Sequence, residues 1–323
     1  MSELRKVQQT PTGTFFVCLP KDWAKKNGLK KGSLVYLDVT SDGKLLVDSQ
    51  YNTETPPRNA CINLGPHLSR EIIGRYLLGY DFIRIETKER IPSDVRDMVK
   101  HTVSSLIGLE IVEESSSTIV LQCLLEPSGF LPGKILQRNY AIVAGMTRDA
   151  ANSFVYGDLH LANNVIARDD ESNRLYFLLV RILRTIIQTP RLSEKLGISP
   201  IECLDFRLAA SLIEGTGDLC VQLAKKTITL NGVKLPIDFQ KLLIELQTTC
   251  NEANQCALKA FVSKDVSLAE DVRNLQQKID IIYSRVEQIA KDSSVDLMPY
   301  LLAAASFLRQ IYERSVDMSD LVV

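Results

Sequence analysis

The sequence of 323 residues predicts a multidomain α+β protein with three parts: a strand-rich segment, a small α/β module and an all-helical region. Up to residue 130, short β-prone runs and turn signals dominate, joined after residue 58 by helical patterns. From residue 134 onward, apolar residues recur at helical spacing and part of the pattern repeats. The expected parts are residues 1–51, 59–130 and 134–323.

Residues 1–51 are expected to form β-hairpins around one short helix. Pro20 stands at the expected helix start, where its missing N–H costs nothing, and Gly28 closes the helix. Asp42-Gly43 is a strong hairpin signal. A β-unit of this size buries little core alone, so we expect it to pair with a second copy or to pack on the rest of the chain. The expected strands are 4–9, 14–19, 33–39 and 44–47.

A Thr-Pro-Pro stretch within residues 51–58 predicts a linker. The module that follows contains no phosphate-binding glycine loop and no defensible Ser/His/Asp set. Ser69 is a candidate N-cap for its first helix, and Gly108 closes its second. The expected elements of the module are strands at 60–64, 82–87, 110–114 and 118–124 and helices at 69–78 and 92–107.

An internal repeat runs through the helical region. Residues 150–176 align with residues 257–283 at an offset of 107, and eight of the 27 positions are identical. Background composition gives roughly one or two matches. We therefore expect two copies of one three-helix unit, packed as an antiparallel bundle, with Asp158 and Asp265 as N-caps of the second helices. The expected repeats span about 134–230 and 236–323, with second helices at 159–188 and 266–291 and third helices at 200–226 and 295–320.

Polar side chains four residues apart on these helices form a candidate metal site. Residues at this spacing share a helix face, and facing helices of a bundle can gather carboxylates around a divalent or transition-metal ion. The more ordinary interpretation is solvated charge or interhelical polar contact. The three histidines, His67, His101 and His160, lack metal-ligand spacing. The candidate ligands are Asp169, Asn173, Glu214 and Asp218 in the first repeat and Asp280 and Glu313 in the second, where Gln276 and Arg309 accompany them.

Charge is distributed unevenly along the chain. The whole chain carries −1, whereas residues 1–51 carry +3 and leave −4 for the rest. This asymmetry suits a DNA-contacting end on a neutral-to-acidic body, although a solvated lysine face would look the same. The candidate DNA-contacting residues are Arg5, Lys6, Lys21, Lys25, Lys26, Lys30 and Lys31.

Seven cysteines without a Cys-x-x-Cys pair argue against a disulfide framework or a structural zinc site. The chain opens without a secretory leader, and its apolar runs are shorter than a membrane helix needs. We therefore expect a cytoplasmic protein without membrane insertion.

The segment from Arg5 to Gln8, the run from Val17 to Ala24 and the turn from Asn27 to Gly32 resemble the AbrB/SpoVT family of DNA-binding domains. The resemblance implies a swapped-hairpin β-barrel built by two chains, hence a homodimer that binds DNA. The run from Leu212 to Asp218 resembles the PhoU family of phosphate-uptake regulators, which are built from two three-helix repeats, apart from Gly215 and Thr216. The combination resembles the AbrB–PhoU fusion proteins of archaea.

The resemblance implies a regulator and not an enzyme: a transcriptional regulator of phosphate homeostasis whose PhoU-like body senses a signal or binds a partner. The alternative is a signalling adaptor that acts on a phosphate transporter or sensor kinase without binding DNA. A weaker third interpretation is a metal-dependent enzyme that uses the carboxylates near Asp169 and Asp218. The family's acidic metal motif maps onto Asp169 with Asn173 and onto Gln276 with Asp280, so each copy has lost one member.

Overall fold

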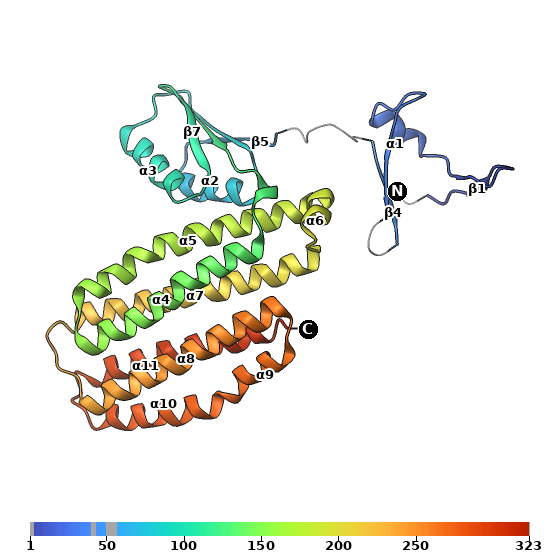
Figure 1. Ribbon diagram of the computed structural model, residues 1–323. Coiled ribbons are helices and arrows are strands. Elements are labelled where there is room, and N and C mark those ends of the chain that lie inside the picture. Colours follow the sequence, from blue (N-terminus) through green and yellow to red (C-terminus); the bar gives the residue numbers. More distant parts are fainter. Residues whose placement is uncertain (1–2, 40–42, 50–56, 323) are drawn as a thin grey trace. The chain divides into compact units, whose positions relative to one another are not determined.

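The computed structural model describes residues 3–39, 43–49 and 57–322, and the chain divides into two compact units, Met1–Pro57 and Arg58–Val323 (Figure 1). Asp42 of the expected hairpin turn and residues 51–56 of the expected linker lie outside the described residues. We refer to the two compact parts as the first unit and the second unit.

The first unit contains two separate antiparallel hairpins and one helix. The expected helix begins after Pro20, and Gly28 adopts the left-handed backbone (φ +66°) that ends it. Three of the four strands are shorter than expected, and the described residues of the single chain do not close a barrel, so the barrel of two chains stays a prediction. Its elements are β1 (Gln8–Gln9), β2 (Phe15–Phe16), α1 (Lys21–Lys26), β3 (Tyr36–Val39) and β4 (Leu45–Asp48).

The second unit begins with a four-stranded sheet in the order β5-β6-β8-β7, in which only β5 and β6 are parallel. Ile62, Ile83 and Leu121 point from the sheet into a core shared with the two helices. Ser69 does not cap the first helix, which already begins at Leu68; its hydroxyl accepts a hydrogen bond from Thr102 instead (3.0 Å). The elements are β5 (Asn59–Asn63), α2 (Leu68–Leu77), β6 (Phe82–Glu86), α3 (Ser93–Ser104), β7 (Leu109–Glu114) and β8 (Thr118–Cys123).

Two stacked helical repeats follow, each built on three antiparallel helical segments (Figure 1). The side chains of Asp158 and Asp265 accept hydrogen bonds from the first turns of α5 and α9, which confirms both predicted N-caps. The helix expected at 266–291 is interrupted at Leu275. The elements are η1 (Pro127–Gly129), α4 (Pro132–Tyr156), α5 (Leu159–Gln188), α6 (Pro190–Leu196), α7 (Pro200–Thr229), α8 (Ile237–Ser263), α9 (Val266–Asn274), α10 (Gln276–Lys291) and α11 (Met298–Ser319).

One apolar core runs through both repeats, because α4 and α7 of the first repeat pack on α8 and α11 of the second. Phe154 of α4 and Phe239 of α8 meet across this boundary with ring centroids 6.3 Å apart. Within the described residues, no helix is both long and apolar enough to cross a membrane.

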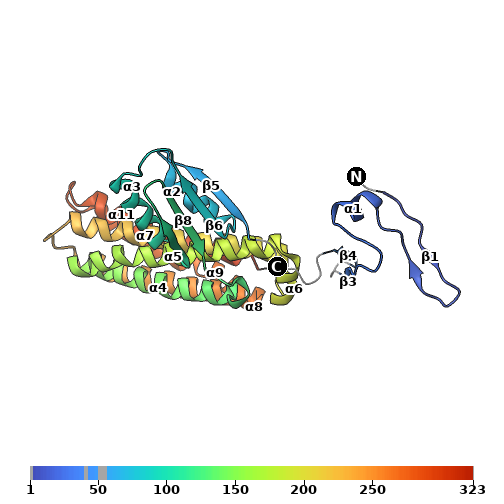
Figure 2. The same ribbon diagram turned by 90° about the horizontal axis from the view of Figure 1, so that it is seen from above.

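A buried arginine joins the α/β module to the first repeat. Arg181 of α5 is 3% exposed, and its Nη1 donates hydrogen bonds to the carbonyl oxygens of Tyr76 (2.6 Å) and Tyr80 (3.0 Å) at the end of α2. Its guanidinium lies 5.0 Å from the centroid of the Tyr76 ring, and Phe177 of α5 packs against the core of the module. Figure 2 shows α5 running beneath the module. The domain bounds of the module and the helical region stay a prediction.

Candidate functional site

The seven basic residues proposed from the sequence to meet DNA are all exposed. Lys21, Lys25 and Lys26 lie on α1, where no residue is buried, and Lys30 and Lys31 form the turn after it. Arg5 and Lys6 precede β1. The Arg5 guanidinium pairs with the Glu3 carboxylate at 2.6 Å. None of these seven side chains packs into a hydrophobic core, and all of them are exposed to solvent.

The first unit also exposes a large apolar surface. No side chain whose exposure the structure describes in this unit is buried, and Phe15, Leu37 and Leu45 are each more than half exposed. Two hairpins with their apolar sides open to water do not form a stable core. The exposed side chains surround a hollow of about 470 Å³, lined by Val7, Phe15, Phe16, Val17, Leu19, Val35, Leu37, Leu45 and Val47.

In the first repeat, the candidate ligands of α5 and α7 come together in part. The amide of Asn173 donates to Oδ2 of Asp169 at 3.0 Å, while Oδ1 of Asp169 is buried without a hydrogen-bond partner. Gly217 of α7 faces that oxygen, and a Cβ at this position would make an ordinary van der Waals contact with it at 3.5 Å. Burial of an unpartnered carboxylate oxygen is costly, and a cation or a polar ligand would remove that cost.

Two carboxyl groups of this cluster, those of Asp169 and Glu214, have a raised pKa. Burial raises the pKa of Asp169, and the negative charge of Asp218 adds to the rise, while the Asn173 hydrogen bond opposes it. Burial also raises the pKa of Glu214, as do the charges of Asp218 and Asp169. In the described ranges, however, no three Asp, Glu, His or Cys side chains stand close enough to hold a metal ion. The donor chemistry fits a hard cation, whereas the positions of the side chains do not enclose one.

The second repeat arranges its polar set differently. Gln276 donates to Oδ2 of Asp280 at 3.0 Å, as Asn173 does to Asp169. The guanidinium of Arg309, on α11, pairs with Asp280 on α10 at 3.3 Å and with Glu313 one turn further along α11 at 3.4 Å. It also stacks 4.8 Å from the centroid of the Tyr283 ring. A cation of the chain itself therefore lies between the two predicted carboxylate ligands.

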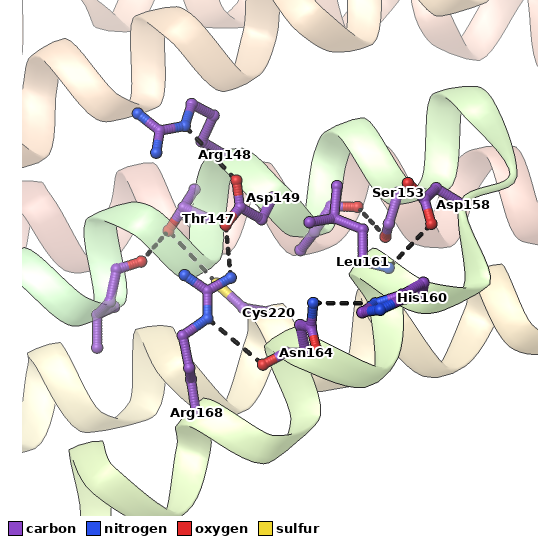
Figure 3. A network of polar contacts seen from close by, with 12 residues as sticks. Thr147, Arg148, Asp149, Ser153, Asp158, His160, Leu161, Asn164, Arg168 and Cys220 are labelled. Atoms are coloured by element: carbon purple, nitrogen blue, oxygen red, sulfur yellow. Dashed lines mark hydrogen bonds and ion pairs between the residues drawn. The ribbon is translucent and has the colours of Figure 1, made fainter.

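Sequence reasoning missed the polar network that orders the first repeat beside Asp169. Arg168 Nη2 pairs with Asp149 of α4 at 2.5 Å, and Arg168 Nε donates to the carbonyl oxygen of Asn164 at 3.4 Å (Figure 3). Figure 3 also shows Thr147 facing Cys220 of α7, 3.3 Å apart. It missed Arg181 as well, although this arginine, one of two within the largely apolar run from Leu178 to Ile187, was a signal for a buried charge.

Comparisons with known proteins agree with this architecture. Residues 136–227 match the PhoU domain family, and residues 8–56 match the family described as "Antidote-toxin recognition MazE, bacterial antitoxin". No curated protein matches the chain.

Two solved PhoU structures resemble the helical region. PhoU from Pseudomonas aeruginosa is 19% identical with a TM-score of 0.52, over 58% of this chain and 92% of that one. The phosphate transport system regulatory protein PhoU from Streptococcus pneumoniae is 18% identical with a TM-score of 0.51, over 59% of this chain and 91% of that one. At these identities the likeness shows a shared fold. The chain therefore combines a MazE/AbrB-type domain at its amino end with a PhoU domain in its helical region.

Proposed function

We propose that this protein is a DNA-binding transcriptional regulator of phosphate homeostasis, in which the PhoU domain senses a signal or binds a signalling partner. The observation that supports it is the pairing of a PhoU domain with a MazE/AbrB-type domain that carries +3 and exposes all seven candidate basic side chains. Both are regulatory families, so an enzymatic role is not proposed. Its site of action is the cytoplasm.

In this proposal two chains pair through their first units. Burial of the exposed apolar side chains and of the hollow of about 470 Å³ against a second copy would be favourable, because it removes apolar surface from water. This pairing would complete the swapped-hairpin barrel. Pairing then sets two copies of the basic side chains on one assembly. Contacts from these side chains to phosphates would supply most of the affinity.

A direct test is fluorescence anisotropy of the full chain with sheared genomic DNA at several salt concentrations. We expect affinity to fall steeply with salt because lysine and arginine contacts release counterions. The double substitution Arg5→Glu and Lys6→Glu should weaken binding at least tenfold, or about 1.4 kcal/mol. The matched control, Lys278→Glu with Lys291→Glu, makes the same charge change at exposed positions of α10 and should bind as the wild type does.

The alternative function is a signalling adaptor that binds a phosphate transporter or a sensor kinase and uses its first unit only to pair. The Arg5–Glu3 ion pair favours it in part, because it neutralises one of the charges that DNA would need. Equal DNA binding by the Arg5→Glu, Lys6→Glu variant and the wild type, or no binding by either at low salt, would reject the regulator as stated and leave the adaptor.

A divalent cation at Asp169, Asn173, Glu214 and Asp218 stays part of the proposal, as one form of the signal. A bound cation would supply the positive charge that draws carboxylates of α5 and α7 together. The unpartnered Oδ1 of Asp169 and the raised pKa of Glu214 support it. Elemental analysis of the purified protein, repeated on Asp169→Asn, tests it: metal that is present in the wild type and lost in the variant is the expected result.

A further inference from the structure

In each repeat an arginine stacks on an equivalent tyrosine, but the two arginines come from different positions of the third helix. Tyr176 and Tyr283 are equivalent by the offset of 107. Arg207 stacks on Tyr176 with 4.9 Å to the ring centroid, and Arg309 stacks on Tyr283 with 4.8 Å. On the third helix of each repeat, however, Arg309 with Glu313 repeats the four-residue spacing of Glu214 with Asp218, so by this spacing Arg309 stands where the first repeat has a carboxylate. In the second repeat, the arginine that stacks on the tyrosine therefore also lies beside the carboxylates of Asp280 and Glu313.

The surroundings of Arg309 hold its guanidinium in that place. It has carboxylates on two sides, Asp280 from α10 and Glu313 from its own helix, and the ring of Tyr283 against its face. A guanidinium is always charged and offers several donors in one plane, which suits two carboxylates and an aromatic face at once. The other oxygen of Asp280 accepts from Gln276, so both of its oxygens have partners.

The first repeat provides the contrast. An arginine of the second repeat, Arg314 of α11, reaches the acidic set of the first repeat: the guanidinium lies against the backbone of α7 where Gly215 leaves room, and a Cβ at Gly215 would overlap it. Arg314 lowers the pKa of Glu214, but burial and the two aspartates outweigh it. Among the described residues, Oδ1 of Asp169 has no hydrogen-bond partner and no arginine forms an ion pair with Asp169.

We propose that Arg309 is a built-in cation that takes the place of a metal ion in the second repeat, so that this repeat is insensitive to divalent metal. A metal ion would have to displace a guanidinium that already pairs with Asp280 and Glu313, and it would meet the positive charge of Arg309 at about the same place. The metal site that family resemblance implies for this repeat therefore does not fit its residues. The proposal is independent of DNA binding and of metal binding in the first repeat.

Mn²⁺ titration of the full chain, followed by the electron paramagnetic resonance signal of free Mn²⁺, tests the proposal. Arg309→Glu replaces the cation with a third carboxylate beside Asp280 and Glu313 and should bind one more Mn²⁺ per chain than the wild type. Arg285→Glu makes the same charge reversal at an exposed position of α10 and should add none. An Arg309→Glu chain that folds and binds no extra Mn²⁺ would overturn the proposal.

A second measurement does not depend on the folding of that variant. In the wild-type background, Asp280→Asn should leave the Mn²⁺ count unchanged. Loss of one equivalent in Asp280→Asn would mean that the second repeat does bind metal and that Arg309 is no substitute. Asp169→Asn reports separately on the first repeat, so failure of the metal proposal there leaves this comparison intact.

Discussion

The two helical repeats share a plan and differ in what their polar side chains do. Asp158 and Asp265 cap equivalent helices, and Ala, Val and Phe positions of the core recur at the same offset. The first repeat directs one buried arginine, Arg181, toward the α/β module, whereas the second places Arg309 between two of its own carboxylates. The duplicated unit has kept its core and caps while its polar positions took different tasks.

The helix break in the second repeat falls at the position equivalent to Arg168. Arg168 of the first repeat ties α5 to Asp149 of α4, and the equivalent residues of the second are Leu275 and Cys256. The second repeat thus lacks the residues of this ion pair at the position where Leu275 divides α9 from α10. Leu275 itself packs on the apolar core. An apolar contact has thus replaced a polar one at the position of the break.

The largest expected effect comes from substitution of Arg181, because its side chain is buried. The equivalent residue of the second repeat, Gln288, is exposed. Arg181→Ala removes one donor from each of the carbonyl oxygens of Tyr76 and Tyr80, of which Tyr76 keeps the N–H of Gly79, and it opens a buried space. We expect a loss of about 3 kcal/mol in the free energy of unfolding. Urea unfolding measures it, and faster hydrogen exchange at the end of α2 should accompany it.

Gln288→Ala is the matched control and should change stability by no more than about 0.5 kcal/mol, since its amide lies on the surface. If both variants lose the same stability, the module is not held by Arg181, and the contrast between the repeats at this position fails.

The sequence predicted much of this fold because local signals were strong. Both aspartate caps, the helix ended by Gly28 and all four strands of the module lie within one or two residues of expectation. Three of the four strands of the first unit are shorter than expected, which fits strand edges that lack a partner. The break at Leu275 carries no glycine or proline signal, and the short helix α6 falls between the helices expected at 159–188 and 200–226.

The candidate sites were predictable as residue sets but not as pairings. Helical spacing placed Asp280, Arg309 and Glu313 on helices that could meet. It did not show that Arg309 lies between the other two, because this depends on how α10 and α11 are rotated and packed. The docking of Arg181 on the module is likewise a tertiary contact, with no local pattern that names its acceptors.

A smaller effect is expected at the ends of α4 and α8. Gly157 adopts the left-handed backbone (φ 67°), and its equivalent Lys264 does so too (φ 54°), the one non-glycine residue with positive φ among those described. Gly157→Ala should cost about 1 kcal/mol from backbone strain alone, because nothing lies near its Cβ position.

In the second repeat the residue with positive φ is not a glycine, so there a substitution to glycine is expected to relieve strain. Lys264→Gly should unfold at a higher urea concentration than Lys264→Ala, because both lose the ion pair with Glu202 and only glycine relieves the strain. Equal midpoints for these two variants would show that the left-handed turn carries no strain there.

The smallest effect concerns the acidic sets, and its sign should differ between the repeats. In the presence of a chelator, Asp280→Asn removes the charge that pairs with Arg309, and a half-exposed pair of this kind is worth about 0.5 kcal/mol or less. Asp169→Asn should instead raise the free energy of unfolding at pH 7, since it removes a carboxylate whose ionisation the fold opposes.

The pH dependence of the Asp169→Asn effect tests whether the raised pKa of Asp169 is its cause. A carboxyl whose pKa is raised on folding favours the folded state at low pH and loses that contribution as the pH rises through its folded pKa. The gain from Asp169→Asn should therefore be present at pH 7 and disappear near pH 3, below the ordinary value of 3.8 for that group. Urea unfolding at both pH values measures it. A loss of stability at pH 7 would mean that Oδ1 of Asp169 has a favourable partner in solution, and the first repeat would then resemble the second in holding its own counter-charge.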